Sequence, residues 1–293
     1  MMKYIHADSF ILSATAAVFL MATAAVFLMS TCFCLYGATV VFADDQIPTA
    51  QELDGEKIPD SYEIKEFPEE YQLPELPTGC ELVALTMMLN FYGYAADKVD
   101  LATDYLPCAD YDLVEGEDGK PYGPDIYDYF VGDPFGIGTV CGPGAIVTTA
   151  SRYMDDQEAL MGTEDSEYSK DNPYNRTVAP DPNAAYLCVP VDTTGFTAQQ
   201  LYALVARNVP VLVWITIDME TRFSPEDHWY TEDGRKMDWS INDHGAVLIG
   251  YSDNKVVIAD PLEGIKAYPR KYFEQIYKSR QYQSVVLWPV KKE

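Results

Sequence analysis

The stretch "PELPTGCELVALTMMLNFYG", residues 74–93, decides the fold because it predicts a helix that begins at a cysteine. Its larger apolar residues recur at spacings of three, four and three, which gives one apolar stripe: Leu82, Leu85, Leu89 and Tyr92. Gly93 is placed to end the helix as the residue after the C-cap. We therefore expect a helix over 78–92, packed on a core along one face.

The start of this helix has the capping-box pattern Thr-Gly-Cys-Glu, with Thr78 as the predicted N-cap and Glu81 three residues later. Cys80 then lies in the first turn, where backbone N–H groups have no intrahelical partner and the helix dipole favours a thiolate. This position suits a nucleophile, although a small core residue, a disulfide partner or a metal ligand would also fit the pattern.

Residues 1–43 are predicted to be a signal peptide. No charged residue occurs from Phe10 to Ala43, and the octamer ATAAVFLM is repeated in tandem over 14–29. Val41-Phe42-Ala43 fits a signal peptidase site. An uncleaved membrane anchor is the alternative, and either interpretation makes the rest of the chain exported and secreted or held at the cell surface. We expect a polar linker over 44–66 and one catalytic domain over 67–293.

The formal net charge of −26 belongs to the exported part, because Lys3 and Asp8 of the leader cancel. Such an acidic chain is a poor partner for nucleic acid or for an anionic membrane surface. We expect membrane contact only through an uncleaved leader. We also expect no cofactor and a monomeric protein.

The remaining pattern predicts helices first and strands later, which is typical of an α+β fold with an antiparallel sheet. Helices are expected over 142–154, 197–208 and 270–278, and strands over 211–217, 245–251, 255–259 and 283–288. Residues 107–140 are interpreted as a long ordered loop, and 155–185 as an acidic surface insertion.

A thiolate nucleophile needs a histidine, and outside the leader only His228 and His244 are available. His228 lies in a polar loop and is interpreted as a solvent-facing residue. A hairpin centred on Ser252 pairs positions equidistant from it, so His244 and Asp260, each eight residues away, are expected side by side. Asp260 would then orient the imidazole, although an ordinary polar pair closing a hairpin is the alternative.

Three further cysteines follow the leader, and we expect at most one disulfide, between Cys108 and Cys141, with Cys188 left free. A zinc site at Cys80, His244 and Asp260 is disfavoured because the chain has no CxxC or HExxH motif. For the oxyanion of acyl transfer, the backbone N–H of Cys80 is one natural donor, and the side chain of Gln72 is the other candidate.

The segments QLPELPTGCELVALTMMLNFYG, YFVGDPFGIGTVCGPGAIV, VPVLVWITIDM and DHGAVLIGYSDNKVVIADPLEG resemble papain-fold cysteine peptidases. The closer resemblance is to the extracellular bacterial C-thirty-nine-like group, which is related to the bacteriocin-leader peptidases, and it spans residues 68–289. It implies a papain-like fold, in which the catalytic cysteine begins a helix packed on an antiparallel sheet.

The resemblance also implies roles: Cys80 as nucleophile, His244 as general base and acid, Asp260 as orienting acid, and Gln72 as oxyanion donor. In that family the glutamine usually lies six residues before the cysteine, whereas here Pro74 has that place. The expected function is exported hydrolysis of peptide or amide bonds through a thioester, with a peptide or protein substrate. A catalytically silent cell-surface binding module and a peptidoglycan stem-peptide amidase are the alternatives.

Overall fold

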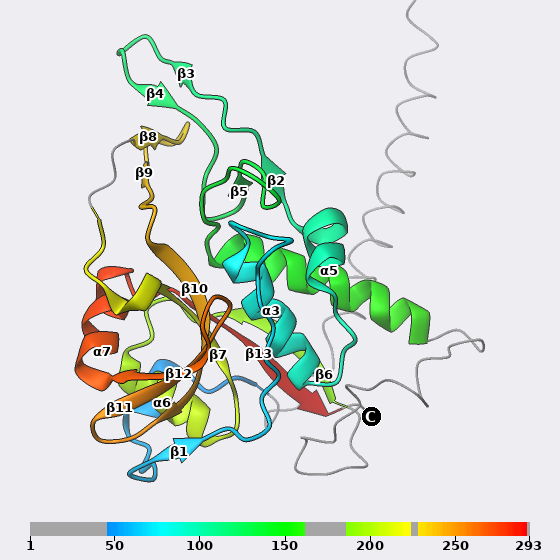
Figure 1. Ribbon diagram of the computed structural model, residues 1–293, viewed down its shortest axis with the longest axis vertical. Coiled ribbons are helices and arrows are strands. Elements are labelled where there is room, and N and C mark those ends of the chain that lie inside the picture. The colour runs from blue at the N-terminus through cyan, green and yellow to red at the C-terminus, as the bar shows by residue number, and fades with distance from the viewer. Residues whose placement is uncertain (1–45, 162–185, 224–227, 292–293) are drawn as a thin grey trace, which may run out of the picture. The chain divides into compact units, whose positions relative to one another are not determined.

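The computed structural model of the chain describes residues 46–161, 186–223 and 228–291 (Figure 1). The predicted leader and most of the predicted acidic insertion lie outside these residues. Within the described part, no helix is both long enough and apolar enough to cross a membrane. The description below concerns the compact unit that begins at Ile47.

A seven-stranded antiparallel sheet forms the centre of this unit. Its strands lie in the order β12 (Gly264–Pro269), β11 (Lys255–Asp260), β10 (Asp243–Tyr251), β7 (Val211–Thr216), β13 (Ser284–Lys291) and β6 (Tyr186–Asp192), while β1 (Tyr62–Glu63) pairs with the far end of β10. The four strands expected from the sequence are present, and β1, β6 and β12 were not predicted.

Helices cover both faces of the sheet, since every residue of β7 and β10 is buried. One face carries α3 (Cys80–Phe91) and α5 (Pro143–Met161), and the other carries α6 (Ala198–Ala206) and α7 (Arg270–Ser279) (Figure 1). A capping box starts α6 at the expected position, because the Thr197 hydroxyl accepts from the Gln200 N–H and Gln200 Oε1 accepts from the Thr197 N–H. Helix α3 and helix α5 precede most strands of the antiparallel sheet in the chain, which confirms the predicted α+β class.

The segment 107–140 contains short strands rather than loop alone. They are β2 (Cys108–Ala109), which pairs with β5 (Phe130–Val131), and β3 (Val114–Glu115), which pairs with β4 (Pro121–Tyr122). A small sheet joins β4 to β8 (His228–Tyr230) and β9 (Lys236–Asp238). Before them lie the short α4 (Lys98–Asp100) and the π-helical turn η1 (Leu101–Tyr105), and after β7 comes the 3₁₀ turn η3 (Ile217–Met219).

Part of the segment expected to be a linker belongs to the same compact unit. It contains α2 (Ala50–Asp54), whose Leu53 is 2 % exposed, and β1, which is followed by the equally buried Ile64. The polar composition of 44–66 concealed these two anchoring residues. The folded unit therefore begins about twenty residues before the predicted boundary at 67.

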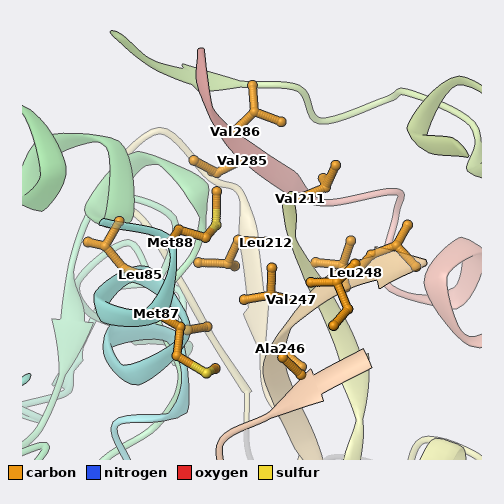
Figure 2. Close-up of a cluster of buried hydrophobic side chains, with 14 of the residues drawn as sticks. Leu85, Met87, Met88, Val211, Leu212, Ala246, Val247, Leu248, Val285 and Val286 are labelled. Atoms are coloured by element: carbon orange, nitrogen blue, oxygen red, sulfur yellow. The ribbon is translucent and has the colours of Figure 1, made fainter. Parts of the chain in front are cut away.

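The core lies between α3 and the sheet (Figure 2). Leu85 and Met88 of α3 face the strand residues Leu212, Val247 and Val285, all with less than 1 % of their surface exposed. All twelve residues of α3 are buried, not only the predicted stripe. A helix that is covered all round is fixed in position by its neighbours, so its first residue has a defined place above the sheet.

We predict that Leu212→Ala lowers the free energy of unfolding by about 2–5 kcal/mol, because it leaves a cavity between α3 and the sheet. Ile137→Ala is the control: Ile137 is 93 % exposed, and a surface truncation changes stability by about 0.5 kcal/mol or less. Urea unfolding of the full chain, followed by circular dichroism, measures both. Equal losses in the two variants would contradict this packing.

Candidate active site

Cys80 is the first residue of α3, one position nearer the helix start than predicted. Gly79 is the N-cap and makes no side-chain capping bond, while the Thr78 hydroxyl instead donates to the carbonyl oxygens of Asp133 and Pro134, at 3.3 and 3.4 Å. A Cβ on Gly79 would lie 2.9 Å from Cβ of Leu76, so only glycine fits this turn. The predicted capping box is wrong, but the cysteine does begin the helix.

The thiol of Cys80 lies between two groups. Its Sγ is 3.2 Å from Oε2 of Glu81 and accepts a hydrogen bond from the N–H of Gly245 in β10, at 3.4 Å. Burial and the neighbouring Glu81 carboxylate raise the pKa of this thiol well above its ordinary value. Within the described part of the chain, no hydrogen bond joins Cys80 to His244.

His244 and Asp260 meet as predicted, although the register differs. Nε2 of His244 lies 2.8 Å from Oδ1 of Asp260, and both side chains are at most 3 % exposed. The turn is centred between Asp253 and Asn254, so Tyr251 lies opposite Val256, three residues beyond its expected partner. A bulge in β10 between Leu248 and Gly250 takes one residue back, so that Ala259 lies opposite Val247 rather than opposite Gly245. The shift is of two residues, which preserves the face of each side chain, and the pair therefore meets diagonally.

Asp260 is held in its ionised form. Burial opposes the charge, but the hydrogen bond and charge of His244, together with the N–H groups of Leu262 and Glu263, outweigh it and lower the pKa of Asp260. The Leu262 N–H lies 2.8 Å from Oδ1. Because Nε2 of His244 faces this carboxylate, Nδ1 is the ring nitrogen available to another partner.

Glu81 is the residue whose place was missed. Predicted to close a capping box with Thr78, it is instead fully buried beside Cys80, and its Oε1 has no hydrogen-bond partner. Burial raises the pKa of Glu81 to about 7, against the lowering effect of nearby N–H groups, the Cys80 thiol and His244. The signal in the sequence was ambiguous, since a glutamate in a first helical turn is usually exposed.

Gln72 is buried and lies in the loop before α3. Its N–H donates to the carbonyl of Pro261, at 2.9 Å, which joins this loop to the residue after Asp260. Its side-chain Nε2 donates to the carbonyl of Pro77, also at 2.9 Å, and Oε1 has no partner. Gln72 therefore lies near the helix start, but its role as an oxyanion donor stays a prediction.

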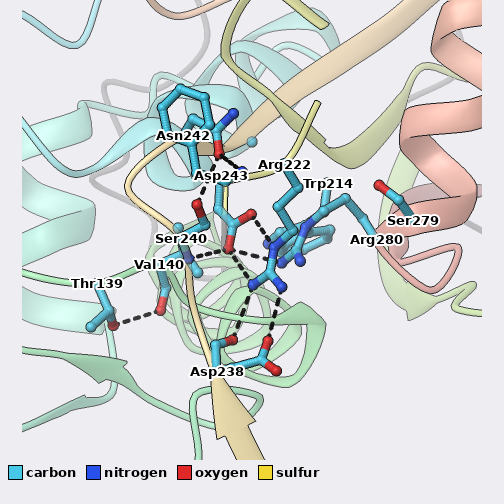
Figure 3. A network of polar contacts seen from close by, with 12 residues as sticks. Thr139, Val140, Trp214, Arg222, Asp238, Ser240, Asn242, Asp243, Ser279 and Arg280 are labelled. Carbon is cyan, nitrogen blue, oxygen red and sulfur yellow. Dashed lines mark hydrogen bonds and ion pairs between the residues drawn. The ribbon is translucent and has the colours of Figure 1, made fainter. Parts of the chain in front are cut away.

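A buried ionic network fixes the strand segment before His244 (Figure 3). Asp243, fully buried, accepts two hydrogen bonds from Arg222, at 2.8 and 2.9 Å, and one from the N–H of Ser240, at 2.8 Å. Arg280 lies 3.3 Å from the same carboxylate, and Asp238 accepts from Arg222, at 2.9 Å. This network anchors the first residue of β10, which sets the position of the adjacent imidazole. Nothing in the sequence pairs these residues.

The other sequence-predicted residues lie apart from the site or are unpaired. The four cysteines after the leader are all free thiols, so the predicted Cys108–Cys141 disulfide is wrong: Cys108 is exposed, whereas Cys141 is buried. His228 is an exposed residue of β8. Among the described residues, no group of three or more His, Cys, Asp or Glu side chains could hold a metal ion.

Comparisons with known proteins decide the family. The profile described as "Peptidase_C39 like family" matches residues 64–285. This chain belongs to the C39-like peptidase family. A crystal structure from Bacillus anthracis, described as a C39-like peptidase, is 26 % identical, with a TM-score of 0.59, and the match covers 79 % of this chain and 99 % of that one. No curated protein sequence matched significantly. The match supports the predicted papain-like α+β fold.

The raised pKa of Glu81 predicts a pH-dependent stability. Because the folded chain binds the Glu81 proton more tightly than the unfolded chain, the unfolding free energy falls as the pH rises from 4.5 to about 7. The loss is on the order of 3 kcal/mol. Glu81→Gln cannot ionise and should remove this part of the slope. Urea unfolding at a series of pH values measures it; identical slopes for the two proteins would contradict the assignment.

Asp243→Ala is expected to destabilise the protein by about 3–5 kcal/mol, because the guanidinium groups of Arg222 and Arg280, on side chains 18 % and 10 % exposed, lose the carboxylate they share. The control is Lys65→Ala, which breaks the ion pair between Lys65 and Glu63. The Lys65 side chain is 74 % exposed, and such exposed pairs contribute about 1 kcal/mol or less. Urea unfolding measures both losses. A loss at Asp243 as small as that at Lys65 would show that the network is not structural.

Proposed function

We propose that the protein is an exported cysteine peptidase that hydrolyses peptide or amide bonds with Cys80 as nucleophile, His244 as base and Asp260 as orienting acid. One observation supports this most directly. The buried His244 of β10 lies 2.8 Å from Asp260 of β11, and the next residue of β10 is Gly245, whose N–H contacts Cys80 Sγ at 3.4 Å. A thiol, an imidazole and a carboxylate thus converge at the junction of helix and sheet.

In the first step, the Cys80 thiol transfers its proton to Nδ1 of His244, and Sγ attacks the substrate carbonyl carbon. The oxyanion accepts a hydrogen bond from the backbone N–H of Cys80, which has no intrahelical partner at the helix start. Gln72 is the proposed second donor, provided that its amide turns from the Pro77 carbonyl. The C–N bond then breaks, and His244 returns the proton to the leaving amine.

In the second step, water attacks the thioester carbonyl while His244 accepts a proton from it. The C–S bond breaks, which releases the carboxylic acid product and returns the proton to the Cys80–His244 pair. Throughout, Asp260 holds Nε2 and stabilises the charged imidazolium, because its own carboxyl stays ionised in the buried site. No cofactor is required for these steps.

The apolar leader and the motif Val41-Phe42-Ala43 support export, with release from the membrane after cleavage or retention at the cell surface without it. A peptide or protein is the proposed substrate. A stem-peptide amidase would use the same three residues, and it differs only in the bond that is cleaved.

The test is hydrolysis of a panel of fluorogenic peptides and purified peptidoglycan by the full chain. We expect Cys80→Ala and His244→Ala to lower kcat/KM by at least about 10³-fold, and Asp260→Asn by about 10²-fold or more. His228→Ala is the matched control: it removes an exposed histidine outside the site and should retain activity.

The panel also separates the alternatives. Cleavage of peptidoglycan alone would favour the amidase. Turnover that survives in Cys80→Ala, or wild-type protein that cleaves nothing across the panel and a pH range, would contradict a peptidase and leave the binding module.

A further inference from the structure

The closest polar contact of the Cys80 thiol is the carboxyl of Glu81, not the imidazole of His244. Oε2 of Glu81 lies 3.2 Å from Sγ, and Glu81 is fully buried. The carboxyl cannot easily turn away, because β10 presses on it: a Cβ on Gly245 would lie 2.7 Å from Cγ of Glu81 and 3.0 Å from its Cα. Its second oxygen, Oε1, has no hydrogen-bond partner.

The Cys80 thiol and the Glu81 carboxyl are more stable in this contact when one proton lies between them than when both groups are ionised. At 3.2 Å, either the thiol donates to the carboxylate, or the carboxylic acid donates to the thiolate. If both groups were ionised, two negative charges would lie together in a buried site, which is strongly unfavourable. The ionisation of Cys80 and that of Glu81 therefore oppose each other.

Other charged or titratable groups face Glu81 from each neighbouring element. His244 on β10 and Arg280 after α7 favour its ionised form, while the Cys80 thiol shares its proton and the buried thiol of Cys141 stays neutral before α5. Asp260 on β11 adds negative charge that disfavours a Cys80 thiolate. Arg280 is itself paired with Asp243, so burial outweighs the attraction.

Resting on the proposed nucleophilic role of Cys80, we propose that Glu81 is a positioning residue that makes the site active only when its carboxyl is protonated. The protonated carboxyl donates a hydrogen bond to Sγ, so the thiol can pass its proton to His244 and remain as a stabilised thiolate. When Glu81 loses its proton to solvent, the carboxylate instead accepts a hydrogen bond from the thiol, which keeps its proton, so the sulfur stays neutral. The raised pKa of Glu81, about 7, puts this change in the neutral range.

The test is the pH profile of alkylation at Cys80, measured by iodoacetamide labelling of the full chain and mass spectrometry of its peptides. For the wild type, we expect the rate at Cys80 to fall about tenfold as the pH rises through the neutral range. In Glu81→Gln, whose amide donates at every pH, the rate should not fall. The exposed Cys108 is the internal control, and its rate should rise with pH in both proteins.

A wild-type rate at Cys80 that rises steadily with pH, as at Cys108, would overturn the proposal, and this outcome does not depend on any variant. Glu81→Asp keeps an acid and should keep a pH transition, whereas a merely structural role would alter the rate equally at all pH values. If the wild type hydrolyses the peptides but its alkylation rate at Cys80 has the same pH profile as that of Glu81→Gln, this inference is wrong and the proposed function stands. If Cys80→Ala still hydrolyses the peptides, the proposed function itself is wrong.

Discussion

The packing of the first turn of α3 against Gly245 is the constraint on which the site depends. The helix supplies Cys80 and Glu81, the strand supplies His244, and the two elements approach so closely that only glycine fits between them. The N–H of Gly245 also contacts Sγ. A side chain at this position would separate the helix from the sheet, and with it the nucleophile from its base.

The surrounding structure holds this junction from both sides. Behind the helix, a fully buried α3 transmits the packing of the core to its first residue. Behind the strand, Arg222 and Arg280 hold Asp243, the first residue of β10 (Figure 3). Apolar packing locates the helix, whereas ionic contacts locate the strand, because the strand begins at the edge of the core where polar side chains can still find partners.

The sequence predicted the α+β class and the meeting of His244 with Asp260, because hydrophobic periodicity and a short turn are local properties. The same arithmetic detected neither the true centre of the turn, which shifts the pairing by three residues, nor the bulge in β10, which reduces the shift to two. The contact survived because the net shift is even. The capping box and the disulfide failed for a different reason. Tertiary packing sets the contacts of Thr78 and Glu81, and it buries Cys141 while leaving Cys108 exposed; residue spacing does not encode either outcome. The anchoring roles of Leu53 and Ile64 were hidden by their polar neighbours.

The loop before α3 explains how the spacing between Gln72 and Cys80 can differ from the family pattern. Gln72 is tied to the Pro261 carbonyl and Leu76 is buried, whereas Leu73, Pro74 and Glu75 between them are exposed. The two ends of this short arch also hold each other, because the Leu76 N–H donates to the Gln72 carbonyl at 2.8 Å. An arch closed at its base leaves only the three exposed positions 73–75 outside the anchored structure, so evolution or engineering can alter the chain there while Gln72 and Leu76 keep their places.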